Sequence, residues 1–511
     1  MADTCLPTKP SFDLESAVLR FVQDWRCVGL IVLAAVLQQA LGHLNGDDSW
    51  FLTFAEKYRD GFVPYVDISD PNPPAAFLAY LPAVFLGRVF AAPPELFVVI
   101  LTFLGAGLSS LLAGIILRRA GLLPRSATFG ALAIAAYVLL FVPAFCFAER
   151  EHLALLAFLP MVAVAAGRAS GGRVAWRDAV LAGIGCGLAC AFKPYYLLPA
   201  ASIFLCAAGL RRKPRLLLAP EIFAAGAVLL AYGIAIFAFF PAYLSRALPL
   251  ALDVYAPLKD SLVHIFASPL FLANFVVLAA LLFAARSYKI QPRTLVLVAA
   301  SAGFLATFVI QGKGWMNHAY PGTALALLAA ASFLSEGADA GRSRRVFALF
   351  VFIPALCVAP FLFGTTKDFG NGEEYPGLTA AVQRIAPAHP SMAALAEQLD
   401  IGHPLVRRLG GTWVGRQNCL WVSWGVRYLL RHRPESASQR AWLLGAMRDD
   451  EATFAADVDR GKPDILLVEN KDVETWARRQ AAFAPIFRDY RQVEEASGVE
   501  VWRRERPDGD R

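Results

Sequence analysis

The sequence predicts an α-helical membrane protein with about eleven spans, followed by a small C-terminal α/β domain. Of its 511 residues, 57% are hydrophobic and only 17% are charged, and the mean hydropathy is +0.49. Globular proteins are about 25% charged, so this composition excludes a soluble multi-domain enzyme and a disordered chain. Apolar stretches of about 18 or more residues recur, and this is the length that a helix needs to cross a bilayer.

The expected membrane region covers residues 27–363, after an N-terminal tail at 1–26. A long first outer loop at 45–94 is expected to contain juxtamembrane helices. Within it, the apolar segment 75–90 is short and contains Pro82, Gly87 and Arg88, so we interpret it as juxtamembrane or re-entrant rather than spanning. The predicted spans are 27–44, 95–117, 126–146, 151–167, 179–192, 194–210, 219–240, 265–285, 294–311, 319–335 and 346–363.

The basic residues support this interpretation, because cytoplasmic loops are the ones enriched in Lys and Arg. If 75–90 does not cross, one side carries Arg118, Arg119, Arg125, Arg168, Arg173, Arg177, Arg211, Arg212, Lys213, Arg215, Arg286, Lys289, Arg293, Arg342, Arg344 and Arg345. The short connections on the other side carry Arg150, Lys193, Arg246, Lys259 and Lys313. We therefore expect a cytoplasmic N-terminus and a C-terminal domain on the outer side of the membrane. The net charge of +7 is then explained by the basic loops on the cytoplasmic side, so no nucleic-acid partner is expected.

The polar region 364–511 is long enough for a small core of its own. Residues 378–386 have helical spacing, 465–468 read as a short strand, and 489–503 read as a hairpin around Ser497 and Gly498. The eight cysteines form neither a disulfide framework nor a paired metal motif.

The first outer loop begins with two adjacent carboxylates, Asp47 and Asp48, and an ionisable residue at a span end is costly unless it is paired or functional. An interfacial amphipathic helix is expected from about Trp50, with Asp48 or Ser49 as its N-cap. We expect one of the two aspartates to be a general base. Asp47 is favoured, because Asp48 has the better capping position.

Other polar residues are expected at the same outer boundary. The span before Lys193 has about 14 residues, roughly 21 Å of helix, so Lys193 is expected to lie below the membrane surface. The other candidates for binding are Asp67, Asp70, Arg150, His152, Tyr195, Lys313, Trp315 and His318. Each of these residue types also has a structural alternative to a binding role. Lysines snorkel to the membrane surface, arginines form structural ion pairs, histidines lie in cores, and aromatic residues form interfacial belts.

Several segments of the sequence, in the order in which they occur, resemble the GT-C glycosyltransferases, such as protein O-mannosyltransferases and lipid A aminoarabinose transferases. The resemblance rests on the acidic pair and on the segments 61–67 (GFVPYVD), 70–74 (DPNPP), 148–152 (AEREH), 192–196 (FKPYY), 311–318 (QGKGWMNH) and, weakly, 411–416 (GTWVGR). Where many relatives have Lys, this chain has Asn72. The resemblance implies a GT-C-like fold and a hexosyl- or pentosyltransferase with a polyprenyl-phosphate-linked sugar donor. It also implies a bacterial inner membrane, in which the outer side and the C-terminal domain are periplasmic.

The residue types suit this chemistry. A sugar on a lipid phosphate has a good leaving group, so the enzyme needs cations for the departing phosphate and a carboxylate for the proton of the acceptor hydroxyl. We expect transfer to a glycan, lipid or protein acceptor of the cell envelope, with membrane lipids around the protein. The sequence indicates no certain cofactor, and the four loop carboxylates are compatible with a divalent cation, Mg²⁺ or Mn²⁺. The alternatives are a membrane transporter or lipid flippase, and a polysaccharide polymerase or ligase.

Overall fold

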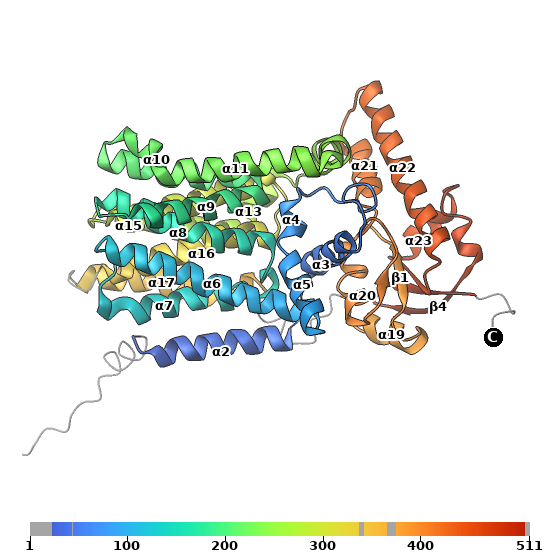
Figure 1. Ribbon diagram of the computed structural model, residues 1–511, viewed down its shortest axis with the longest axis horizontal. Coiled ribbons are helices and arrows are strands. Elements are labelled where there is room, and N and C mark those ends of the chain that lie inside the picture. Colours follow the sequence, from blue (N-terminus) through green and yellow to red (C-terminus); the bar gives the residue numbers. More distant parts are fainter. Residues whose placement is uncertain (1–22, 43, 337–341, 365–374, 506–511) are drawn as a thin grey trace, which may run out of the picture.

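The computed structural model describes residues 23–42, 44–336, 342–364 and 375–505. They form a bundle of long, roughly parallel helices, with a smaller α/β domain packed against one end of the bundle (Figure 1). Most of the expected tail 1–26, part of the connection 336–345 and the beginning of the region 364–511 lie outside the described residues. The domain boundaries proposed from the sequence stay predictions.

Each of the eleven apolar segments contains a helix. The helices are α2 (Trp25–Leu41), α6 (Pro94–Arg119), α7 (Thr128–Ala136), α8 (Arg150–Ser170), α9 (Trp176–Phe192), α10 (Leu197–Arg211), α11 (Pro220–Phe239), α14 (Pro269–Ala284), α15 (Pro292–Gln311), α16 (Met316–Ser335) and α17 (Arg342–Leu362). Within the described ranges, five helical segments are long and apolar enough by themselves to cross a membrane, and the bent pair formed by α2 and the following helix would make a sixth. The chain is therefore a multi-pass membrane protein, while the number of eleven spans stays a prediction.

The helix before Lys193 is longer than the sequence indicated. α9 has 17 residues, about 26 Å at 1.5 Å per residue, which is still less than the roughly 30 Å hydrocarbon core. It ends because Lys193 has extended backbone, with φ −148° and ψ 121°, as a residue before proline prefers. Pro194 then begins the short turn η4 (Pro194–Tyr196), from which α10 continues.

Three helices of the first loop lie between the bundle and the C-terminal domain (Figure 1). They are α3 (Gly46–Arg59), α4 (Ala75–Leu78) and α5 (Leu81–Phe90). The expected cap of α3 was wrong: the helix begins at Gly46, and the Asn45 side chain accepts the Asp48 N–H at 2.9 Å. Neither Asp48 nor Ser49 is the N-cap, so the two aspartates occupy the first turn, where the helix dipole favours negative charge.

The expectation that α3 lies at the lipid interface was also wrong. Every residue from Trp50 to Ala55 is buried, because the C-terminal domain covers the side of α3 that the bundle leaves open. Arg407 of that domain donates to Glu56 at 2.6 Å and to Glu95 of α6 at 2.6 Å. This arginine, whose side chain is 11% exposed, therefore joins α3, the bundle and the C-terminal domain.

The C-terminal domain contains one five-stranded sheet in the order β2-β1-β3-β5-β4. β1 is parallel to β2 and β3, whereas β5 is antiparallel to β3 and β4. Ser497 and Gly498 turn the expected hairpin with φ of 52° and 81°, the left-handed region that such turns require. The elements are α19 (Leu378–Ile385), β1 (Ser391–Leu395), α20 (Leu405–Arg408), β2 (Thr412–Trp413), α21 (Trp421–His432), α22 (Ala437–Gly461), β3 (Ile465–Val468), α23 (Lys471–Arg478), β4 (Tyr490–Ala496) and β5 (Val499–Arg504).

Both faces of this sheet are covered, which explains the continuous apolar run of β3. On one face, Leu466 and Val468 pack in a core with Phe454 of α22 and Ala477 of α23. The other face belongs to the core that continues through α3 into the bundle. The two parts of the molecule therefore share one hydrophobic core, and this fixes α3 against the end of the bundle.

Candidate active site

Asp47 and Arg150 form an ion pair between the first turns of α3 and α8. The Arg150 guanidinium donates to Asp47 Oδ2 at 2.6 Å and to the side-chain oxygen of Asn72, and it lies 4.6 Å from the centre of the Phe51 ring. The Arg150 side chain is 5% exposed, whereas that of Asp47 is 27% exposed. Asp47 is therefore a charged carboxylate with an open side.

Asp48 differs from its neighbour. It is completely buried, and the Tyr80 hydroxyl donates to its Oδ1 at 2.5 Å. Among the described residues, no group makes a hydrogen bond to its Oδ2. Burial raises the pKa of the Asp48 carboxyl well above its usual range, and the Asp47 charge raises it further. Asp48 is thus suited to a neutral structural role, and Asp47 is the one of the pair that can accept a proton.

Lys193 points into the protein rather than toward the membrane surface. Its ammonium forms an ion pair with Glu151 of α8, donates to Gln311 at 3.2 Å, and lies 2.9 Å from His318 Nε2. The Lys193 side chain is 12% exposed and that of Glu151 is not exposed. This geometry contradicts the snorkelling alternative for Lys193, because a snorkelling lysine places its ammonium in water.

Lys313 is held by neutral groups. Its ammonium donates to the carbonyls of Tyr255 at 2.7 Å and Leu258 at 2.5 Å, and lies 4.0 Å from the centre of the Tyr255 ring. Burial lowers the Lys313 pKa to about 7, and the charges of Lys193 and Lys259 contribute. The Trp315 ring lies 5.3 Å from that of His318, so Lys313 and Lys193 belong to one polar region.

The remaining predicted residues do not join this cluster. Asp67 accepts the Val63 N–H at 2.8 Å, which stabilises a turn of its own loop. His152 lies in the core, where its ring packs edge-on against Tyr320. Tyr195 uses its carbonyl to accept from the Thr307 hydroxyl at 3.3 Å, and its side chain is 39% exposed.

Asp70 is a structural neighbour of the cluster. It accepts from the Trp50 indole at 2.8 Å and from the Asn72 N–H at 2.7 Å. Burial raises the pKa of the Asp70 carboxyl to about 6. Asp70 thus positions Asn72, whose side chain contacts Arg150.

The four loop carboxylates are not arranged as a metal site. Asp47, Asp48, Asp67 and Asp70 each have a different partner. In the part of the chain that the structure describes, no group of three or more His, Cys, Asp or Glu side chains is placed to hold a metal ion. The idea of a Mg²⁺ or Mn²⁺ site therefore gains no support from these residues.

Sequence reasoning missed several members of the cluster. Glu151 carries the central negative charge, and it was visible only as part of the run Glu149-Arg150-Glu151. Asn72 and Gln311 lay in segments that carry the resemblance, but neither was assigned a role. Tyr80 had no signal, because a single tyrosine in an apolar segment is ordinary. Their roles depend on which helices meet, and this information is not local in the sequence.

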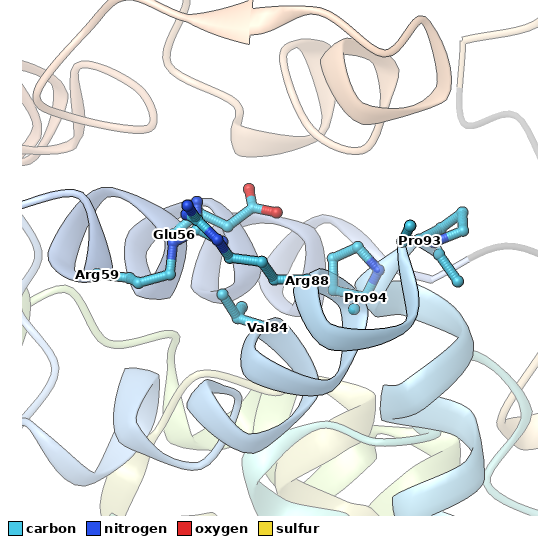
Figure 2. Close-up of a pocket in the computed structure, with 9 residues that line it drawn as sticks. Glu56, Arg59, Val84, Arg88, Pro93 and Pro94 are labelled. Atoms are coloured by element: carbon cyan, nitrogen blue, oxygen red, sulfur yellow. The ribbon is translucent and has the colours of Figure 1, made fainter.

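A hollow of about 430 Å³ lies between the C-terminal part of α3 and the junction of α5 and α6 (Figure 2). Glu56 and Arg59 line it from α3, whereas Arg88 and Pro94 line it from the other side. None of its lining residues belongs to the cluster around Arg150 and Lys193, so we do not place the chemistry there.

The arrangement brings one open carboxylate and three cations to the end of the bundle that faces the C-terminal domain. Such a site can bind a phosphate group through Arg150, Lys193 and Lys313, and it can remove a proton through Asp47. The buried partners hold these groups in fixed positions, which electrostatic stabilisation requires.

Two solved structures have this fold over nearly the whole chain. ArnT from Cupriavidus metallidurans in the apo state gives a TM-score of 0.55 at 13% identity, over 95% of this chain and 98% of that chain. ArnT from the same organism bound to undecaprenyl phosphate gives a TM-score of 0.53 at 15% identity, over 96% and 98%. No family model and no curated protein matches the sequence. The chain therefore has an ArnT-like fold, and the expected architecture of a helical membrane bundle with a small C-terminal α/β domain is confirmed.

Proposed function

We propose that this protein is a membrane glycosyltransferase that moves a sugar from a polyprenyl-phosphate donor to an acceptor of the bacterial cell envelope, on the periplasmic side of the inner membrane. The observation that carries the proposal is the cluster of Asp47, Arg150, Lys193 and Lys313 at one end of a GT-C-like bundle. The undecaprenyl phosphate bound by one of the ArnT structures supports the lipid part of the donor.

In this reaction an acceptor hydroxyl attacks the anomeric carbon of the sugar. Its proton passes to Asp47, the new glycosidic bond forms, and the bond from the sugar to the phosphate breaks with its electron pair going to the phosphate. Because the attack occurs opposite the leaving group, the configuration at the anomeric carbon is inverted. Asp47 is suited to this step because its carboxylate is charged, fixed by Arg150 and partly open.

The cations bind the phosphate before and after the transfer. Lys313 is held by two carbonyls and an aromatic face, so its positive charge is available to an anion. Arg150 and Lys193 already have carboxylate partners, and they add to the positive field at short range. A phosphate ester that enters this partly dry region gains more from these charges than it would in water.

A direct test measures donor binding and transfer by the full-length protein in lipid nanodiscs. Wild-type protein is expected to bind an undecaprenyl-phosphate-linked sugar, and Lys313→Ala is expected to bind it at least about 10-fold more weakly, the equivalent of one charge-assisted hydrogen bond. Lys289→Ala is the matched control, because Lys289 is exposed in a loop that the sequence places on the other side of the membrane.

Mass spectrometry of envelope glycans from a deletion strain gives the second part of the test. Loss of one sugar substituent, together with accumulation of its polyprenyl-phosphate carrier, is the expected result. An unchanged set of glycans and lipid-linked sugars, or a wild-type protein that binds no such donor, contradicts the proposal. Transport of a lipid-linked sugar without bond cleavage would instead favour the flippase alternative.

A further inference from the structure

A second cavity lies between the first loop, the segment after α11 and the C-terminal domain. Its volume is about 560 Å³, and Figure 1 shows the end of α11 close to α21 and α22. The first loop contacts the domain here, because Ser69 forms a bridge with Gln417 and its N–H donates to the Arg416 carbonyl at 2.9 Å. We call this cavity the interdomain groove. The residues that line it include Tyr65, Asp70, Arg246, Gln417, Trp421 and Trp442.

Two buried polar atoms of this groove have no partner among the described residues. Trp421 is 8% exposed and its indole N–H makes no hydrogen bond, and Gln417 is 1% exposed and its Oε1 accepts none. The Gln417 amide orientation is determined by its environment, because its NH₂ group lies 3.4 Å from two oxygens of Asp450. An unpaired buried donor or acceptor is costly. A ligand that accepts a hydrogen bond from the Trp421 indole and donates one to the Gln417 side-chain oxygen is therefore favoured.

The rest of the lining indicates the class of ligand. Hydroxyl groups both donate and accept hydrogen bonds, and several aromatic rings offer flat apolar faces. Trp442 is 37% exposed on α22, and Tyr65 lines the groove from the first loop. Both signs of charge line the groove, with Arg246 and Arg416 as well as Asp70, Asp449 and Asp450. Such a mixture suits a neutral or weakly charged polyhydroxyl group better than an apolar chain or a phosphate cluster.

The groove is connected to the candidate active site by two chains of contact. On one wall, Tyr65 donates through its hydroxyl to the Asn72 carbonyl at 2.8 Å, and the Asn72 side chain accepts from Arg150. On the other wall, the Trp421 ring lies 6.4 Å from the Tyr255 ring. The backbone carbonyl of Tyr255 accepts a hydrogen bond from Lys313. A molecule in the groove therefore lies next to the residues that would hold the donor phosphate.

We propose that the interdomain groove binds the acceptor, and that the acceptor is a carbohydrate whose hydroxyl groups pair with Trp421 Nε1 and Gln417 Oε1. This inference rests on the proposed glycosyltransferase function and adds the acceptor class to it. Trp442 and Tyr65 pack against the faces of the sugar rings. The C-terminal domain thus supplies the specificity for the acceptor, while the bundle and α3 supply the donor site.

The test separates acceptor binding from donor binding. The full-length protein in nanodiscs is given an undecaprenyl-phosphate-linked sugar and the glycolipid fraction extracted from the deletion strain. Trp421→Phe keeps an aromatic ring but removes the N–H, and Trp442→Ala removes an exposed ring. Trp476→Phe is the matched control, because Trp476 is partly buried in the same domain and lies outside the groove.

Trp421→Phe and Trp442→Ala are each expected to raise KM for the glycolipid about 3- to 10-fold, the loss of one hydrogen bond or one stacking contact. The kcat and the Kd for the donor are expected to stay within about 2-fold of wild type, as in Trp476→Phe. Mild periodate treatment, which cleaves vicinal diols, is expected to abolish use of the glycolipid as an acceptor.

Unchanged KM values in both groove variants overturn the inference, and so does transfer to a protein or to a lipid without sugar. A fall in donor affinity in Trp421→Phe and Trp442→Ala but not in Trp476→Phe overturns it as well, because the groove then belongs to the donor. Failure of wild-type protein to bind the donor counts against the proposed function itself, and this result is measured without any acceptor.

Discussion

Exchanging each member of the aspartate pair for asparagine separates two chemical roles at neighbouring positions. Asp47→Asn removes the only proton acceptor of the pair that is partly open, since its side chain is 27% exposed and that of Asp48 is buried. Asp48→Asn replaces a carboxyl that burial keeps neutral by an amide of the same shape. The first exchange is expected to stop transfer, and the second is expected to leave most of it.

The magnitudes follow from the contacts. Loss of a general base lowers kcat about 10²–10⁴-fold, or about 2.7–5.4 kcal/mol in the activation barrier. In Asp47→Asn the side-chain amide oxygen still accepts from Arg150, so the stability cost is expected to stay below the roughly 3 kcal/mol of a charged hydrogen bond. For Asp48→Asn, Tyr80 still has an oxygen acceptor, and we expect kcat within about 10-fold of wild type.

The assay measures single-turnover transfer from the donor lipid, with donor Kd and thermal unfolding determined on the same preparations. Asp67→Asn is the matched control, because it makes the same chemical change in the same loop at a carboxylate that stabilises a turn. The expected pattern for Asp47→Asn is near-normal melting, normal donor binding and almost no transfer.

Two results would refute this reasoning. One is an Asp47→Asn protein that transfers sugar within about 10-fold of the wild-type rate, which would show that Asp47 is not the base. The other is an Asp48→Asn protein that folds and binds donor but is as inactive as Asp47→Asn. In that case the buried carboxyl is charged during the reaction, and the roles of the two residues are exchanged.

Three further predictions concern the cations and the topology. Donor affinity is expected to fall about 10-fold between pH 6.5 and 8.5, because Lys313 has a pKa of about 7 in the protein without donor and only its protonated form attracts phosphate. Lys313→Met is expected to bind the donor weakly, with a Kd that does not change with pH. A pH-independent Kd of the wild-type protein would contradict this prediction. Lys193→Ala leaves Glu151 buried without its cation, so unfolding should become easier by about 3–5 kcal/mol. Adding Glu151→Gln should restore melting but not donor binding, and restored binding would refute a role for Lys193. A reporter fused after Gly364 is expected to be active only in the periplasm, whereas cytoplasmic activity would reverse the proposed orientation.

Much of the fold was predictable because its signals are local. Apolar length indicates a membrane helix, and a helix lies in each of the eleven segments that the sequence marks. Segment 75–90 was recognised as unusual from Pro82 and Gly87, and it contains the two short helices α4 and α5. The C-terminal hairpin follows from Ser497 and Gly498, since few residues adopt the left-handed backbone that the turn needs.

The candidate site was predicted only in outline. Charge at the ends of apolar segments drew attention to Asp47, Arg150, Lys193 and Lys313, because an ionisable residue in such a position is costly. The same reasoning selected His152, which lies in the core away from the cluster. From the sequence, a polar side chain that faces the cluster and one that faces away from it look alike, since only about half a turn of helix separates the two directions.

The sequence by itself determined the class of molecule, the helical segments and the end of the bundle at which the candidate site residues lie. Only the tertiary structure decided which aspartate is open and which is buried, since this depends on Tyr80 and Arg150 from other segments. It also decided that α3 is covered by the C-terminal domain and that Trp421 approaches Tyr255. The physical reason is that burial and pairing are properties of surfaces brought together by folding, whereas hydrophobic length and turn propensity are carried by neighbouring residues.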